Sequence, residues 1–283
     1  MAKEKVLVVG LGEVGRAIFD LLKETGRFTV YGFDVDKSKM HDIAQSSLST
    51  KMDLMHICIP CASQEGFVKA VVEYAKRYKP KLAIIDSTIP PGTTNSVSKQ
   101  CTCLVAHSPF RGVHKTPEHM KWELKRWTKY IGGVNPEAAK AADTHFKKMG
   151  LKTKVLKSCA ETELAKLFET TYRAWMIVCF QEMHRISRFF GADFDEVSDF
   201  LEDTHRVTLD RPLMFPDVIG GHCVIPNAEI LLKSYDSEFL HLILKSNQKR
   251  KEETKDKAVR REIERIQQRT RALQEELTKK LAE

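Results

Sequence analysis

The sequence has no long apolar run. No stretch of the 283 residues approaches the roughly 20 consecutive apolar residues that a membrane-spanning helix needs. The first residues, Met-Ala-Lys-Glu-Lys, lead straight into a short apolar segment and lack the apolar core and small-residue cleavage site of a signal peptide. We therefore expect a soluble, cytoplasmic protein that has no membrane contact.

The cysteines are odd in number and irregularly spaced. The chain has seven cysteines, an odd number, which argues against a disulfide framework and favours reduced thiols. Cys58 and Cys61 have the spacing of a redox or zinc site, whereas the spacing of Cys101 and Cys103 is poorer for zinc. We favour the simpler interpretation, in which Cys58 ends a buried strand and Cys61 begins a loop. No metal site is predicted.

The strongly charged C-terminal segment lacks aromatic residues. Residues 247–283 contain twelve Lys and Arg against eight Asp and Glu, so +4 of the net charge of +8 lies there. Without aromatic side chains to stack on bases, this excess indicates a solvated helix rather than a nucleic-acid surface. Its apolar residues repeat in alternating steps of four and three, which is typical of a short coiled-coil seam: Val259, Ile263, Ile266, Thr270, Leu273 and Leu277. The segment could dimerise, pack back on the body, or project.

The first half of the chain alternates strand and helix patterns. This alternation predicts an α/β fold with a mostly parallel sheet covered on both faces, over residues 1–157. The predicted strands are residues 6–9, 28–33, 55–59, 82–85, 103–106, 130–131 and 153–156, and the helices are 14–23, 63–77 and 137–149.

Beyond residue 158 the pattern becomes helical. Residues 161–190 contain no Gly or Pro, and their apolar residues cover more than one stripe, which predicts one long helix buried on several sides or between two subunits. Shorter helices are expected at 195–201 and 227–232, with a functional loop at 206–221. We expect an all-α central dimerisation and catalytic domain at 158–236 and a charged helical extension at 237–283.

A glycine motif follows the first strand. The run Gly10-Leu11-Gly12-Glu13-Val14-Gly15 lies between that strand and the first helix, the context in which this spacing indicates dinucleotide binding. Gly10 would make the tight turn, Gly12 would let the backbone approach a pyrophosphate, and Gly15 would let the helix pack on the sheet. The helix N-terminus would hold the phosphates.

Asp34 ends the second strand, 19 residues beyond Gly15. An acid at this position accepts hydrogen bonds from ribose hydroxyls and repels a 2′-phosphate, so the predicted cofactor is NAD rather than NADP. Two alternatives stay open: Asp34 and Asp36 could form only an Asx turn, and the fold could bind phosphate without redox chemistry.

Further motifs resemble the UDP-glucose/GDP-mannose dehydrogenase family over roughly residues 1–235. The matching pieces, in chain order, are the Gly10 motif, Phe33-Asp34, Cys58-Ile59-Pro60, Ser87 to Thr94, Ser108-Pro109, Ile131 to Gly133, Glu163 to Lys166, and Gly220-Gly221-His222-Cys223. The resemblance implies a Rossmann-like NAD-binding domain followed by a central helical domain that forms homodimers. It also implies cofactor contacts for Pro60, Ser87 and Thr88.

In this family, an alcohol is oxidised to an aldehyde, a cysteine thiolate traps the aldehyde, a second hydride leaves, and water cleaves the thioester. The resemblance implies that Cys223 is the nucleophile, Lys166 stabilises the oxyanion, and Thr88 positions the water. The glycines before Cys223 would present backbone donors to a thiolate. We also predict substrate contacts for Thr170, Gly220, Gly221 and His222.

The sequence departs from the family pattern at four places. The family has Asn where this chain has Thr170, an acid where it has Asn227, and Glu where it has Phe110. The family's third domain, which holds much of the nucleotide, has no counterpart after about residue 236. These departures leave NAD binding untouched and weaken four-electron oxidation, because losing one acid–base group costs on the order of 10²–10⁴ in rate.

Three functions follow. The first is an NAD-dependent oxidoreductase that acts on a sugar-like or small anionic substrate, with Cys223, Lys166, Thr88 and Asn227 at its catalytic centre. The second is a two-electron hydroxyacid or alcohol dehydrogenase that uses Lys166, with Cys223 as a bystander. The third is a degenerate NAD-binding regulatory or scaffold protein.

Overall fold

The computed structural model describes residues 3–40, 51–112, 116–221 and 223–280. The chain folds into two compact units, residues 1–167 and 168–283. The boundary between them falls inside one helix, α6 (Cys159–Phe189).

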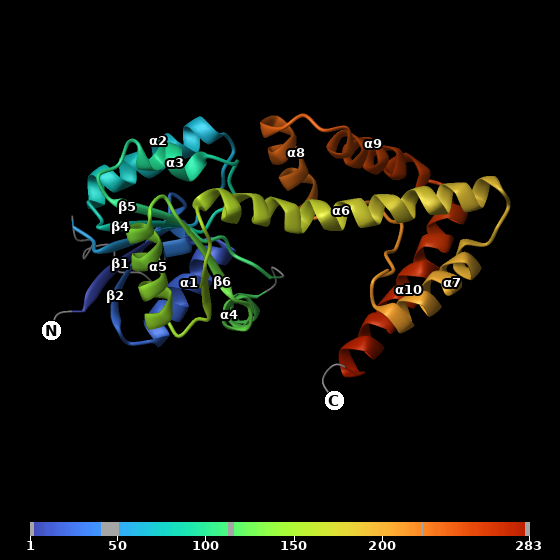
Figure 1. Ribbon diagram of the computed structural model, residues 1–283, viewed down its shortest axis with the longest axis horizontal. Helices are drawn as coiled ribbons and strands as arrows, with labels where there is room; N and C mark the ends of the chain where they lie inside the picture. Colours follow the sequence, from blue (N-terminus) through green and yellow to red (C-terminus); the bar gives the residue numbers. More distant parts are fainter. Residues whose placement is uncertain (1–2, 41–50, 113–115, 222, 281–283) are drawn as a thin grey trace. The chain divides into compact units, whose positions relative to one another are not determined.

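The first unit is built on a seven-stranded sheet in the order β2-β1-β3-β4-β5-β6-β7 (Figure 1). All neighbouring strands are parallel except β5 and β6, which are antiparallel. The strands are β1 (Glu4–Val9), β2 (Phe28–Phe33), β3 (Leu54–Ile57), β4 (Leu82–Ile85), β5 (Leu104–His107), β6 (Lys129–Gly133) and β7 (Thr153–Val155).

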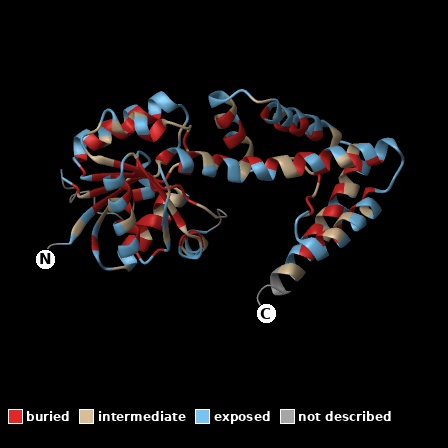
Figure 2. Ribbon diagram, in the orientation of Figure 1, coloured by how far each residue is buried: buried red, intermediate tan, exposed pale blue. Residues whose placement is uncertain are grey.

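The central strands are apolar along their whole length because helices cover both faces of the sheet. Every residue of β3 and β4 is buried, which gives these strands a continuous rather than alternating apolar pattern (Figure 2). One face packs against α1 (Glu13–Glu24), α4 (Pro117–Arg126) and α5 (Pro136–Lys148). The other face packs against α2 (Gln64–Tyr78) and α3 (Thr93–Ser98). The predicted Rossmann-like α/β fold is confirmed.

Side-chain caps fix where three of these helices begin. The Ser63 hydroxyl accepts from the Gly66 N–H at the start of α2, and the Asn135 amide oxygen accepts from the Ala138 N–H at the start of α5. At the start of α4, Thr116 accepts from the His119 N–H. Each cap satisfies a backbone donor that the first helical turn leaves without a partner.

The second unit is helical. After α6 come α7 (Phe194–Thr208), α8 (Val224–Ser234), α9 (Glu238–Glu253) and α10 (Lys257–Lys280). The fully buried Arg250 of α9 donates to the Gln181 carbonyl of α6 at 2.7 Å, which joins the two helices through a charge-assisted hydrogen bond.

The helix α10 packs back on its own unit. It lies beside α7 (Figure 1), and Arg269 of α10 bonds to Asp195 and Asp199 of α7 at 3.0 and 2.5 Å. Five of its six seam residues are buried: Val259, Ile263, Ile266, Thr270 and Leu273. Of the three arrangements that the repeat allowed, the structure therefore has the intramolecular one.

Several predicted boundaries were wrong. The helix expected at 195–201 continues to Thr208, which shortens the predicted loop at its start. The buried face of α7 includes polar residues, Ser198, Glu202 and His205, so the apolar periodicity there is weak. The helices α3 and α4 were not predicted. None of the helices among the described residues is both long enough and apolar enough to cross a membrane.

Candidate functional site

The glycine motif forms a tight turn between β1 and α1. Gly10 has φ +86°, the left-handed region that glycine tolerates, and its N–H donates to the Phe33 carbonyl at 2.8 Å. A Cβ on Gly10 would lie 2.6 Å from the Cys58 carbonyl oxygen, and one on Gly15 would lie 1.7 Å from the Gly10 carbonyl oxygen. Only glycine therefore fits at these two positions.

Gly12 has a different environment. No atom lies within 4 Å of a Cβ built on it, and its φ of −67° is available to any residue. Gly12 also precedes α1 with no side-chain cap. No protein atom crowds Gly12, so the fold itself does not require glycine there. Close approach of a pyrophosphate to the backbone would require it.

The Asp34 carboxylate braces this turn. One oxygen accepts from the Leu11 N–H at 2.7 Å, and the other accepts from the Asp36 N–H at 2.9 Å. The Asx turn considered above is therefore present, and the same side chain also ties the end of β2 to the glycine turn. The exposed Val35 beside it, 82% accessible, offers an apolar surface at this edge.

The loop 86–94 follows β4 at the same carboxyl edge of the sheet. The Ser87 hydroxyl lies 2.6 Å from the Ile59 carbonyl oxygen and 3.2 Å from that of Ile57, which joins this loop to the one after β3. Thr88 is half-buried, and Pro60 is exposed at the neighbouring loop. The structure thus brings Pro60 and Ser87 to the edge that carries the glycine turn.

Two buried contacts fasten this loop to the first turns of α6. The Nε2 of His107 donates to the Ser87 carbonyl at 3.1 Å, and its Nδ1 lies 2.8 Å from the Thr162 hydroxyl. Burial lowers the pKa of His107 to about 4, so the ring is neutral at physiological pH. A neutral ring that donates from Nε2 can only accept at Nδ1.

Glu163 provides the second contact. Its carboxylate accepts from the Gly92 N–H at 2.7 Å, the Thr94 N–H at 2.9 Å and the Thr94 hydroxyl at 2.5 Å, and it is 1% exposed. Burial raises the pKa of this carboxyl, and the three donors oppose that effect. The sequence motif that contains Glu163 did not predict this contact, and no pattern predicted the contact of His107.

Lys166 lies one turn beyond Glu163 in α6 and is half-buried. Its positive charge contributes to lowering the pKa of His107, so it acts on the residue that holds Ser87. Within the first unit, the fold therefore gathers Lys166 and the loop that contains Thr88. No cluster of three metal-ligating side chains occurs in the described part of the chain.

Cys58 and Cys61 have the environment of structural thiols. Burial raises the pKa of Cys58 well above its usual value and that of Cys61 to about 11, so both thiols are protonated at neutral pH. Phe110 is also internal: it is 2% exposed and belongs to the same apolar cluster as Met120 and Leu124.

Cys223 lies in the second unit, at the start of α8. It is partly buried and occupies the N-cap position, and its carbonyl accepts from the Asn227 N–H at 3.0 Å. A helix N-terminus favours negative charge, which a thiolate would supply. Gly221 before it has φ +80°, a conformation that glycine adopts without strain. Gly220 is exposed, and His222 lies outside the described residues.

Asn227 and Thr170 contact each other. The Asn227 amide nitrogen donates to the Thr170 hydroxyl at 3.0 Å, and Asn227 is 5% exposed. Two of the positions that depart from the family pattern therefore form one hydrogen-bonded pair, one turn of α8 from Cys223. Neither side chain can take a proton from water at neutral pH.

The parallel sheet and the glycine turn define a Rossmann-type dinucleotide-binding fold. The model of the UDP-glucose/GDP-mannose dehydrogenase family, central domain, matches residues 160–249. The chain is similar to this family. NAD is the cofactor of the family, and the open Gly12 and the braced Asp34 fit it.

Individual relatives agree with this placement. A UDP-N-acetyl-D-mannosamine dehydrogenase of Methanocaldococcus jannaschii is 28% identical over 78% of this chain and 60% of its own length. The chain thus spans about 60% of the length of the curated relatives it matches. Two solved structures share the fold. The UDP-N-acetyl-mannosamine dehydrogenase of Staphylococcus aureus has TM-score 0.68 and 20% identity over 87% of this chain and 68% of its own. A 3-hydroxyisobutyrate dehydrogenase of Mycobacterium tuberculosis has TM-score 0.65 and 14% identity, covering 94% of this chain and 99% of its own.

Proposed function

We propose that the protein is an NAD-dependent dehydrogenase that oxidises the alcohol or aldehyde carbon of a sugar nucleotide or a related anionic substrate. The observation that carries the proposal is the pairing of two features in one chain. A glycine turn braced by Asp34 is followed by a family-type central domain with Cys223 at a helix N-terminus. The named relatives act on nucleotide sugars, which favours that substrate class.

The glycine turn and Asp34 would hold NAD, which would supply the hydride acceptor for the oxidation. The Lys166 ammonium would stabilise negative charge on the substrate oxygen, since a fixed cation is most effective where charge develops. The Cys223 thiolate would add to the aldehyde carbon, and the start of α8 would stabilise that thiolate. Thr88, held by the clamp of Glu163 and His107 on its loop, would orient water or substrate.

Steady-state NADH formation tests this proposal. The wild-type protein, given NAD and UDP-N-acetyl-D-mannosamine, should show rising absorbance at 340 nm. Cys223→Ser should reduce kcat by about 10² or more, because an alcohol is a far weaker nucleophile than a thiolate. Cys179→Ser, at an exposed cysteine of the same unit, is the matched control and should leave kcat unchanged. Full activity of the Cys223 variant would refute the thiol role.

A second candidate is a two-electron dehydrogenase that stops at the carbonyl. The pair of Asn227 and Thr170 favours it, because no carboxylate stands there to activate water for thioester cleavage. The ratio of NADH to substrate separates the two, since acid formation gives two NADH per substrate and carbonyl formation gives one.

We also propose a homodimer formed through the long helix predicted at 161–190. Its apolar side chains include several that stay exposed in the single chain: Phe168, Tyr172, Ile186 and Phe189. Exposed apolar clusters of this kind favour association. Sedimentation equilibrium should give twice the chain mass of 32.3 kDa, and a monomer at micromolar concentration would contradict the proposal.

A further inference from the structure

The chain has two close pairs of cysteines, and both lie in the first unit. Cys58 and Cys61 have the spacing of many redox sites, whereas a single residue, Thr102, separates Cys101 from Cys103. All four thiols are free and partly buried. The structure gives the two pairs different surroundings, and these surroundings show which pair is suited to redox chemistry.

The thiols of Cys58 and Cys61 have separate partners. The Cys61 thiol donates to the Ser63 carbonyl at 3.6 Å, and the Cys58 side chain packs on the glycine turn, with its Cβ 3.1 Å from a Cβ built on Gly15. Burial raises the pKa of both thiols, so neither supplies a thiolate at neutral pH. This pair therefore has a structural role despite its spacing.

The thiols of Cys101 and Cys103 interact with each other. A hydrogen bond joins the two side chains, and it lowers the pKa of Cys101 and raises that of Cys103. These directions make Cys103 the donor and Cys101 the acceptor. The Lys76 ammonium of α2 also lowers the pKa of Cys101, against the effect of partial burial. The pair thus combines a thiol that ionises readily with a second thiol in contact with it.

The backbone that carries this pair is irregular and open to solutes. It joins the end of α3 to the start of β5, and the chain bends at Thr102. The bend already brings both sulfurs within hydrogen-bonding reach, so a bond between them requires only a local rearrangement outside helix and sheet. Gln100, the residue before Cys101, and Lys76 line a hollow of about 620 Å³ between α2 and α3, which gives a small solute access to this segment.

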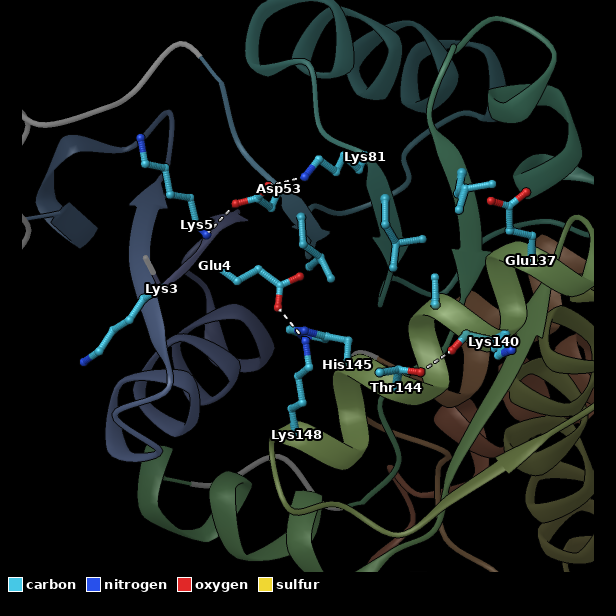
Figure 3. A pocket seen from close by; sticks show the side chains of 14 residues that line it. Lys3, Glu4, Lys5, Asp53, Lys81, Glu137, Lys140, Thr144, His145 and Lys148 are labelled. Carbon is cyan, nitrogen blue, oxygen red and sulfur yellow. Dashed lines mark hydrogen bonds and ion pairs between the residues drawn. The ribbon is translucent and has the colours of Figure 1, made fainter. Parts of the chain in front are cut away.

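The pair lies away from the edge of the sheet that carries the glycine turn. Cys103 directly precedes Leu104, the first residue of β5, and Leu104 lines a hollow at the amino edge of the sheet (Figure 3). Gly10 follows the carboxyl end of β1, and the strands from β1 to β5 in the sheet are parallel. Chemistry at Cys101 and Cys103 is therefore separate from cofactor binding at the carboxyl edge.

We propose that Cys101 and Cys103, with Lys76 beside them, form a reversible dithiol–disulfide site that hydrogen peroxide oxidises. The Cys101 thiolate attacks one peroxide oxygen: an S–O bond forms, the O–O bond breaks, and the leaving hydroxide takes up the proton that Cys101 lost. The Cys103 sulfur then attacks the sulfenic sulfur, which forms the S–S bond and releases a water that carries the Cys103 proton. Two thiols thus lose two electrons and two protons, and one peroxide becomes two waters. A dithiol reductant restores both thiols by exchange.

Peptide mass spectrometry of the full chain tests the proposal, because trypsin leaves each cysteine pair in a peptide of its own. Residues 100–111 contain Cys101 and Cys103, and residues 52–69 contain Cys58 and Cys61. The reduced protein is treated with a small excess of hydrogen peroxide at neutral pH, unfolded, blocked with N-ethylmaleimide and digested without reductant. Peptide 100–111 should be two hydrogens lighter and carry no blocking group, and peptide 52–69 should carry two blocking groups.

Single variants test the assigned roles. In Cys103→Ser the Cys101 sulfenic acid cannot close a ring, so dimedone, which reacts with sulfenic acids, should label Cys101. In Cys101→Ser dimedone should leave Cys103 unlabelled, because burial keeps that thiol protonated. Lys76→Gln should slow closure of the pair several-fold. Lys69→Gln removes the same charge from the same hollow, two turns earlier on α2, and should leave the rate of closure unchanged.

Four results would each overturn the proposal. They are a peptide 100–111 that keeps both thiols in excess peroxide, closure of peptide 52–69 in its place, equal dimedone labelling of the two cysteine variants, and equal rates of closure in the two lysine variants.

Discussion

At the scale of single residues, the two ends of the glycine motif do different work. Gly15 is required by the fold, since a Cβ there would lie 1.7 Å from a backbone oxygen. Gly12 is not required by the fold, since its Cβ position is open. Both roles, packing for Gly15 and pyrophosphate approach for Gly12, could be predicted from the spacing of the glycines. This is possible because each role depends only on the local geometry of a strand, a turn and a helix.

Alanine at these two positions should therefore separate folding from binding. Gly12→Ala should change the free energy of unfolding by no more than about 1 kcal/mol and still weaken NAD binding strongly. Gly15→Ala should destabilise the protein by about 1–3 kcal/mol or more, because α1 must shift away from the sheet. Urea unfolding and calorimetric titration with NAD measure the two effects, and equal destabilisation by both variants would contradict this account.

At the scale of elements, strands and long helices were predicted well and the contacts between them were not. The strands at 28–33 and 82–85 match the prediction at both ends. The second is a continuous apolar run between turn residues, which marks a buried strand. By contrast, the clamp of Glu163 on Gly92 and Thr94 joins residues about 70 positions apart, and no periodicity encodes it. The family resemblance predicted that Cys223 and Asn227 are site residues. It did not predict that Asn227 contacts Thr170, which only the structure shows.

Glu163→Gln should weaken the attachment between α6 and the loop that carries Ser87 and Thr88. The variant keeps the size of the side chain but weakens three charge-assisted hydrogen bonds, so we expect a loss of about 1–3 kcal/mol in the free energy of unfolding. The kcat should fall as well, because Thr88 loses its fixed position. Glu161→Gln, on an exposed side of the same helical turn, alters only a contact with the Ser158 hydroxyl at 2.6 Å, so it should cost less stability and leave kcat unchanged. Equal behaviour of the two variants would exclude the clamp.

The seam of α10 leads to another expectation. Ile266 is 1% exposed, so Ile266→Ala should cost about 2–5 kcal/mol, measured by chemical unfolding. Because the seam packs within one chain, this loss should not depend on protein concentration. If the unfolding midpoint rose with protein concentration in the wild type but not in the variant, the seam would instead lie between two chains.

At the scale of the whole molecule, buried histidines should make the fold sensitive to mild acid. Burial lowers the pKa of His107 to about 4 and that of His145 well below 6.5. Below pH 6.5 the unfolded chain binds protons at both histidines and the folded chain does not, so stability is lost as pH falls. His107 alone should cost up to about 3 kcal/mol by pH 4.

Unfolding free energies measured at pH 7, 6 and 5 check this expectation. His107→Asn removes the titrating ring and should flatten the slope in this range, while its own stability at pH 7 falls because a buried contact with Ser87 changes. A wild-type stability that stays constant between pH 7 and 5 would show that these rings are protonated in the fold.

The central claim is that Cys223 forms a covalent intermediate during NAD-dependent oxidation. Rapid mixing of the protein with NAD and UDP-N-acetyl-D-mannosamine, followed at 340 nm, tests it most directly. Because Asn227 replaces the family's acid, we predict a burst of two NADH per enzyme, one for each hydride lost before the thioester forms, followed by a slow phase as the thioester hydrolyses. Cys223→Ser should lose the burst. Linear NADH formation at the same rate in both proteins would contradict the claim.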